Sequence, residues 1–126
     1  MKKNVMFMIV RIFVGLVFTM TGAMKLFPMK QPEIPGVAGE FMKGLLASGY
    51  FLPLLGITEL IVGLMLLFNL WSALAAVMLA PITLNIFLYH TILDPSALAI
   101  GVLCILFNIY LLYYHRDKFE PLLKRK

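Results

Sequence analysis

Long apolar runs dominate the chain and predict membrane-spanning helices. Four stretches are almost wholly apolar: residues 5–27, 52–70, 72–90 and 97–114. A helix needs about 20 such residues to cross about 30 Å of hydrocarbon, and each stretch is close to that length. Apolar and polar residues do not alternate strictly, as they would on strands of a membrane barrel. The pattern therefore predicts an all-α, integral membrane, antiparallel four-helix bundle.

The connection between the first two spans has a different character. It is rich in proline, and residues 37–48 combine apolar and charged positions at helical spacing. This pattern predicts a short amphipathic helix that lies on the membrane or is tucked into its surface. We expect Phe41, Leu45 and Leu46 to face inward. The second and third spans are separated by only a few residues, which predicts a tight hairpin.

Composition agrees with this assignment. Of the 126 residues, 62% are hydrophobic and 13% are charged, whereas about 25% of the residues in a soluble domain are charged. Folded in water, such a chain would expose large apolar patches. The length fits a single transmembrane domain, residues 1–126. The single cysteine, Cys104, excludes a disulfide framework or a redox dithiol within one chain.

The net charge of +5 is unevenly distributed. Most of the basic residues lie at the two ends of the chain: Lys2, Lys3, Arg116, Lys118, Lys124, Arg125 and Lys126. Because basic residues favour the cytoplasmic side, we expect both termini to be cytoplasmic. The terminal cluster suits anionic membrane lipids as a partner. The middle of the chain offers no basic face, which excludes a nucleic-acid partner.

Polar residues inside the spans are costly and therefore mark candidate sites. With spans of alternating direction, one group of them falls near the outer side of the membrane: Lys25, Glu59, Asn85 and His90. Arg11 and Asn108 are secondary polar positions on the first and fourth spans. Small residues recur on the same helix faces and permit close packing. The polar groups are thus expected to face the interior of the bundle.

Simpler roles are open for most of these residues. Lys25 and Arg11 can extend toward the two membrane surfaces, and His90 can lie among the lipid headgroups. The two asparagines can form structural hydrogen bonds between helices. Glu59 lies too deep to reach water easily, so we expect it to be paired with Lys25 or protonated.

The chemistry of the group indicates a ligand class. A lysine, a carboxylate, an asparagine and a histidine can hydrogen-bond a carbonyl-bearing lipophile and deliver protons to it, and a quinone headgroup fits that description. One histidine and one glutamate are too few for a closed zinc site, so no metal is expected. The sequence contains no nucleotide-binding or nucleophile motif. Electrons would have to come from a redox partner protein, so the chain is at most one membrane subunit of a quinone-linked oxidoreductase.

A set of short motifs follows in order along the spans. In the first span the motif is Arg11-x3-Gly15-Leu16-x-Phe18-x3-Gly22-x2-Lys25. The others are, in order, Phe41-Met42, Ser48-Gly49-Tyr50, Pro53-Leu54, Glu59-x3-Gly63-Leu64, Ala80-Pro81-Ile82-x2-Asn85-Ile86 and His90-x3-Asp94-Pro95. This ordered set resembles the DoxX and DoxX-like family of small four-span bacterial membrane proteins, and the resemblance covers most of residues 11–123.

The resemblance implies a place in redox biology. The family takes its name from a membrane subunit of an archaeal thiosulfate:quinone oxidoreductase, and some members are linked to redox-stress complexes at the bacterial inner membrane. It implies an inner-membrane protein that binds quinone or lipid and belongs to an oxidoreductase or redox-stress system. Two alternatives are open: a non-enzymatic scaffold or assembly factor, and a small proton-coupled transporter, which would require a homo-oligomer.

Overall fold

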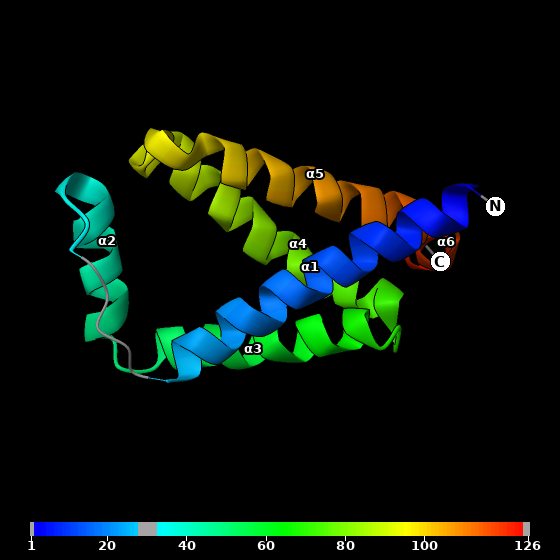
Figure 1. Ribbon diagram of the computed structural model, residues 1–126, viewed down its shortest axis with the longest axis horizontal. Helices are drawn as coiled ribbons and strands as arrows, with labels where there is room; N and C mark the ends of the chain where they lie inside the picture. The colour runs from blue at the N-terminus through cyan, green and yellow to red at the C-terminus, as the bar shows by residue number, and fades with distance from the viewer. Residues whose placement is uncertain (1, 28–32, 125–126) are drawn as a thin grey trace.

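The computed structural model describes residues 2–27 and 33–124, and within these ranges every regular element is helical, which confirms the all-α fold class. Figure 1 shows the helices in chain order: α1 (Lys2–Leu26), α2 (Gly36–Ala47), α3 (Phe51–Leu67), α4 (Ser72–Leu88), α5 (Leu98–Tyr114) and α6 (Arg116–Leu123). Two short elements join α4 to α5: a π-helical turn, η1 (Tyr89–Leu93), and a 3₁₀ turn, η2 (Pro95–Ala97).

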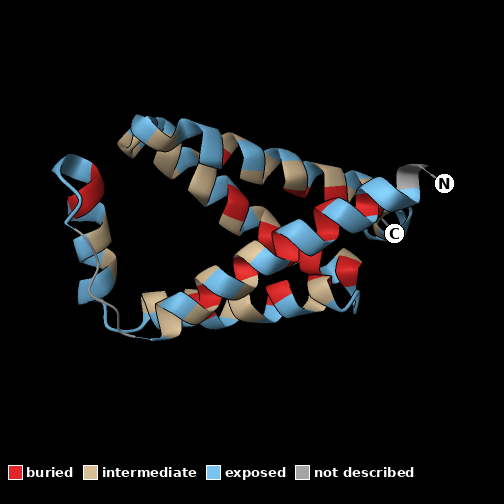
Figure 2. Ribbon diagram, viewed as in Figure 1, coloured by how far each residue is buried: buried red, intermediate tan, exposed pale blue. Residues whose placement is uncertain are grey.

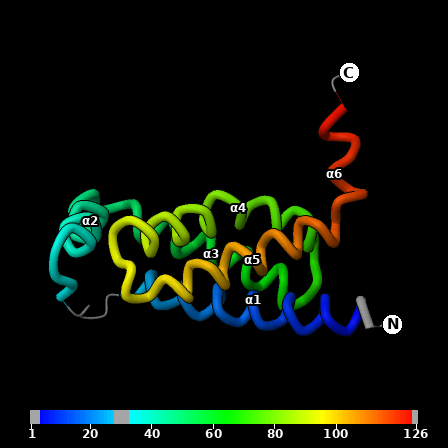
Figure 3. Tube along the Cα trace, turned by 90° about the horizontal axis from the view of Figure 1, so that it is seen from above, coloured from blue at the N-terminus to red at the C-terminus, as the bar shows by residue number. Residues whose placement is uncertain are grey.

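The long helices form two arms. Helices α1 and α3 pack side by side as one arm, and α4 and α5 form the other. The arms meet at the end that carries both chain termini and diverge toward the opposite end, where α2 lies (Figure 1). The view from above in Figure 3 also places α2 and the termini at opposite ends. Termini at the same end are what an even number of antiparallel helices requires.

Length and hydropathy identify this as a multi-pass membrane protein. Three helical stretches are each long and apolar enough to cross a membrane: Asn4–Leu26, Ser72–Leu93 and Pro95–Tyr114. Helix α3 has 17 residues, or about 26 Å of helix, which is near the lower limit for a span. Helices α2 and α3 meet at an angle of 91°, and together they give a fourth candidate span if the bent pair is counted as a single span.

Helix α3 ends earlier than the apolar run predicts. The expected span reaches residue 70, whereas the helix ends at Leu67. The backbone then turns through left-handed conformations at Asn69 (φ 54°) and Trp71 (φ 50°). Ser72 Oγ donates a hydrogen bond to Asn69 Oδ1 across this turn, at 2.6 Å. The apolar residues that follow Leu67 therefore belong to the hairpin rather than to the helix.

Glycines let α1 and α3 touch backbone to backbone. A Cβ atom added at Gly63 would lie 2.4 Å from the backbone nitrogen of Thr19, and one added at Gly22 would lie 2.5 Å from that of Leu60. Any side chain at either position would force the helices apart. This close approach, which the small-residue stripes predict, brings the side chains one turn away into mutual contact.

The buried core lies where the arms meet. Val62 and Leu66 of α3 pack there with Leu79 of α4 and Leu111 of α5, all with no exposed surface. Figure 2 shows the buried residues concentrated in this half of the molecule. Most other apolar side chains on the long helices are exposed, as expected for surfaces that face lipid. The α2 end is therefore less tightly packed and leaves room for a cavity.

The short helix α2 forms as predicted, but one of the three residues expected on its inner face does not lie there. The ring of Phe41 lies 5.9 Å from that of Tyr89, centroid to centroid, and Leu45 is half-buried. Leu46 is 53% exposed, so the expectation that it faces inward is wrong. Ala38 and Gly39 are the buried residues of this helix, because α2 meets the preceding segment at its first turn.

Candidate functional site

Four polar residues that the sequence singles out line one cavity between the two arms. We call it the inner cavity; its volume is about 740 Å³. Lys25 comes from the end of α1, Glu59 from α3, Asn85 from α4 and His90 from η1. Pockets that bind small molecules typically measure about 300–1,000 Å³. The inner cavity is therefore of a size that accepts a small organic ligand.

A buried ion pair forms one side of the inner cavity. Lys25 Nζ lies 2.9 Å from Glu59 Oε2. The Glu59 side chain is only 3% exposed, whereas that of Lys25 is 27% exposed. A carboxylate buried this deeply would be strongly destabilising without a partner. The pairing with Lys25, one of the two states expected for Glu59, explains how the charge is accommodated.

Thr21 completes this pair, and the sequence analysis missed it. Its hydroxyl lies 3.2 Å from Glu59 Oε2, to which it can donate, and 3.3 Å from the carbonyl of Phe18. No described residue forms a hydrogen bond with Glu59 Oε1. The position of Thr21, four residues before Lys25 on the same helix face, was the available clue. One carboxylate oxygen thus accepts from the Lys25 ammonium and lies within reach of the single Thr21 hydroxyl proton.

The second arm supplies the other polar groups. Pro81, which lines the cavity one turn before Asn85, has no N–H for the carbonyl of Val77 and so weakens the helix ladder there. The π turn η1 then follows, and such turns frequently occur at functional sites. It places Tyr89 and His90 on the cavity with their ring centroids 5.1 Å apart, edge to face.

His90 has one ring nitrogen enclosed by protein. Its Nδ1 atom is buried and has no hydrogen-bond partner among the described residues. The Cβ atom of His90 packs closely on Gly101 of α5, where an added methyl group would lie 3.1 Å away. The backbone of α5 therefore holds the histidine from behind.

The remaining lining of the inner cavity is mostly apolar. It includes Val17, Phe18, Leu55, Ile82, Ile86 and Ile100. A few polar groups within an apolar lining are typical of sites that orient a small hydrophobic molecule. Side chains of these types in such a lining are able to hydrogen-bond a lipophilic molecule and to exchange protons with it.

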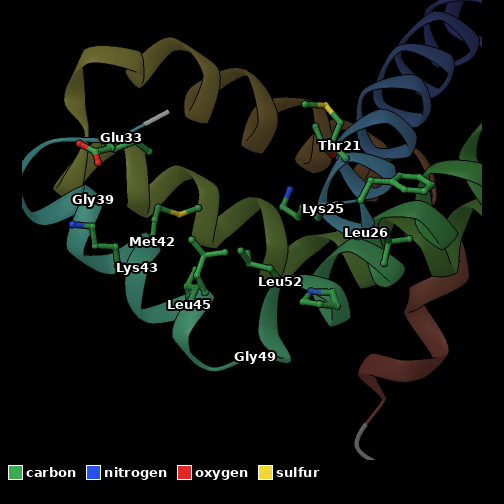
Figure 4. Close-up of a pocket in the computed structure, with 15 residues that line it drawn as sticks. Thr21, Lys25, Leu26, Glu33, Gly39, Met42, Lys43, Leu45, Gly49 and Leu52 are labelled. Carbon is green, nitrogen blue, oxygen red and sulfur yellow. The ribbon is translucent and has the colours of Figure 1, made fainter. Parts of the chain in front are cut away.

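A second pocket adjoins the first on the side of α2. This outer pocket has a volume of about 650 Å³ and shares Lys25 and Thr21 with the inner cavity. Figure 4 shows Lys25 from α1 and Lys43 from α2 on its two sides, with Met42 and Leu45 between them. Lys25 therefore lies at the border between the two spaces.

Arg11 lies away from the inner cavity. Its side chain is buried near the end that carries the termini, where the guanidinium donates hydrogen bonds to the carbonyls of Leu66 and Leu67, the latter at 3.0 Å. These carbonyls lie in the last turn of α3, where they lack partners within the helix and carry the negative end of its dipole. Arg11 thus fixes the end of α3.

Asn108 also has a structural position. Its Nδ2 atom donates to the carbonyl of Ala76 at 3.0 Å, and its Oδ1 atom accepts from Thr83 Oγ1 at 2.8 Å. Both partners belong to α4, so Asn108 clips α5 to α4. It is not one of the residues that line the inner cavity.

In the described part of the chain, residues of the types that hold metal ions do not cluster. Among residues 2–27 and 33–124, no group of three or more histidine, cysteine, aspartate or glutamate residues is placed to hold a metal ion.

Fold and cavity together define a small multi-pass helical membrane protein with an amphipathic cavity between its two arms. The chain belongs to the DoxX family, whose model, described as DoxX, matches residues 6–91. The match includes Lys25, Glu59, Asn85 and His90, and the family is often linked to redox or stress systems. No curated protein and no solved structure matches the chain significantly.

Proposed function

We propose that the inner cavity binds a quinone and that the protein is a membrane subunit of an oxidoreductase or redox-stress system. One observation carries this proposal: an ion pair and a histidine, from different helices, line the same mostly apolar cavity. A quinone suits this cavity because its apolar ring can pack on the apolar lining while its carbonyl oxygens accept hydrogen bonds from the polar side chains. Membership of a family often linked to redox or stress systems supports it independently.

The side chains suit the chemistry of a quinone. Reduction to a quinol consumes two electrons and two protons, and each proton must arrive at a carbonyl oxygen. Lys25 can donate a hydrogen bond to such an oxygen, and Glu59 can exchange a proton beside it. The chain has a single cysteine and thus no dithiol of its own. The electrons come from a partner protein, and the cavity supplies binding and protons.

We further propose a bacterial inner-membrane location with both termini cytoplasmic. The basic residues gathered at the two ends of the chain support this orientation. The α6 helix has no net charge, with Arg116 and Lys118 against Asp117 and Glu120, but it exposes Leu122 and Leu123 by 78% and 84%, which suits a membrane surface. The inner cavity then lies in the outer half of the membrane.

Quinone content of the purified protein tests the binding proposal. The protein is purified in mild detergent, and quinone is extracted and quantified by mass spectrometry per mole of protein. Wild type is expected to retain quinone, and Lys25→Met and Glu59→Gln are expected to lose most of it. Lys118→Met and Glu120→Gln are matched controls on α6, at the opposite end of the molecule, and are expected to retain it. Wild-type quinone content in both cavity variants would refute the proposal.

A further inference from the structure

Hydrogen-bonding groups occupy both arms around the inner cavity. Lys25 and Glu59 belong to the arm formed by α1 and α3. Asn85 and His90 come from α4 and the turn that continues it. Residues of both arms line the cavity, and the arms diverge toward α2 (Figure 1). A ligand in this space meets polar groups from two directions.

On the first arm, Lys25 has donors to spare. An ammonium group carries three N–H donors. Among the described residues, Lys25 Nζ forms a hydrogen bond with Glu59 Oε2 and no other. Its side chain is partly exposed, and Lys25 lines the inner cavity. The ammonium can therefore serve a ligand oxygen without breaking its ion pair.

On the second arm, His90 has one usable nitrogen. Because Nδ1 is buried and has no partner in the part of the chain described, Nε2 is the nitrogen that can reach a ligand. With its proton on Nε2, the neutral ring presents a donor to the cavity, and a ligand oxygen there gives that proton an acceptor.

We infer that the ligand carries two acceptor oxygens on opposite sides of one ring, with one bound by Lys25 Nζ and the other by His90 Nε2. A para-quinone has this arrangement, whereas an ortho-quinone has both oxygens on one side and reaches only one arm. His90 thereby becomes the residue that determines which quinones bind. This inference rests on the proposed function and deepens it by defining the isomer.

Titration of the protein with matched isomers tests the inference. Purified protein is stripped of bound quinone, placed in lipid nanodiscs and titrated with para-naphthoquinone or ortho-naphthoquinone by calorimetry. We expect wild type to bind the para isomer about tenfold more tightly, as the loss of one good hydrogen bond implies. Equal affinities for the two isomers would overturn the inference without the need for any variant.

Two substitutions at His90 distinguish the ring nitrogens. The amide nitrogen of glutamine lies near the position of Nε2, and that of asparagine lies near Nδ1. We expect His90→Gln to retain the para affinity within about threefold and His90→Asn to lose about tenfold, together with the isomer preference. Equal losses in the two variants would overturn the role of Nε2. Absence of para binding in wild type overturns the proposed function itself, whereas para binding that His90→Asn leaves unchanged overturns only this inference.

Discussion

Replacement of Lys25 by methionine would leave the Glu59 carboxylate buried without its cation. The two charged atoms are 2.9 Å apart. At an effective dielectric constant of about 20, their attraction is about 6 kcal/mol before the cost of desolvation is subtracted. Loss of one partner of a buried pair typically costs about 3–5 kcal/mol. Because Lys25 is 27% exposed, we expect Lys25→Met to lower the free energy of unfolding by about 3 kcal/mol, the lower end of this range.

A double-mutant cycle isolates this interaction from the loss of packing. Glu59→Gln should cost less, about 1 kcal/mol, because glutamine is neutral and the exposed part of Lys25 can still reach water. The variant that combines Lys25→Met with Glu59→Gln should cost much less than the sum of the two, with a coupling energy of about 2 kcal/mol. The free energies of unfolding of wild type, the two single variants and the double variant are measured by titration of the detergent-solubilised proteins with dodecyl sulfate.

The control for this cycle is Lys118→Met on the exposed α6 helix, which should change the unfolding free energy by less than about 0.5 kcal/mol. A coupling energy below about 0.5 kcal/mol would contradict a charged pair between Lys25 and Glu59. It would mean that Glu59 is neutral, or that the two side chains are not in contact within the membrane.

Three further predictions concern the frame around the site. Gly63→Ala should destabilise the protein by about 1–3 kcal/mol, because the added methyl group meets the backbone of α1. Gly44→Ala is the control: a methyl group there meets nothing within 4 Å, so this change should be neutral or slightly stabilising. Thermal unfolding of the two variants compares them. Asn108→Leu should cost about 1 kcal/mol by loss of two hydrogen bonds to α4, measured by the same unfolding assay. Burial, and then nearby Lys118, lower the pKa of His115 below its usual 6.5. The unfolded chain therefore binds the proton more readily, so stability should be greatest above pH 6.5 and fall as the pH drops below it. His115→Phe should remove this decline in unfolding titrations run at a series of pH values.

Much of the fold follows from apolar runs and small residues. The runs define four long helices, and glycines such as Gly22 and Gly63 indicate which faces meet. The alternating direction of the helices predicts that Lys25, Glu59 and His90 lie at one level. All three line the inner cavity, so the arrangement of the candidate site was accessible from the sequence.

Other features depend on geometry that no pattern specifies. Thr21 contacts Glu59 only because α1 and α3 pack at backbone contact, while a threonine in a helix ordinarily bonds its own backbone. Arg11 meets the last carbonyls of α3 because that helix ends at Leu67, before its apolar run ends. The π turn at His90 likewise continues an apolar helix without any residue that marks it.

Photoaffinity labelling shows where the quinone ring lies, which we propose is the inner cavity. The protein in nanodiscs is irradiated with an azido-quinone, and the labelled residues are mapped by peptide mass spectrometry. We expect labels on cavity residues such as Leu55, Ile86 and Cys104, and their loss when unlabelled para-quinone is added in excess. Labels confined to exposed, lipid-facing residues such as Ile9 and Leu106, unchanged by the competitor, would contradict it.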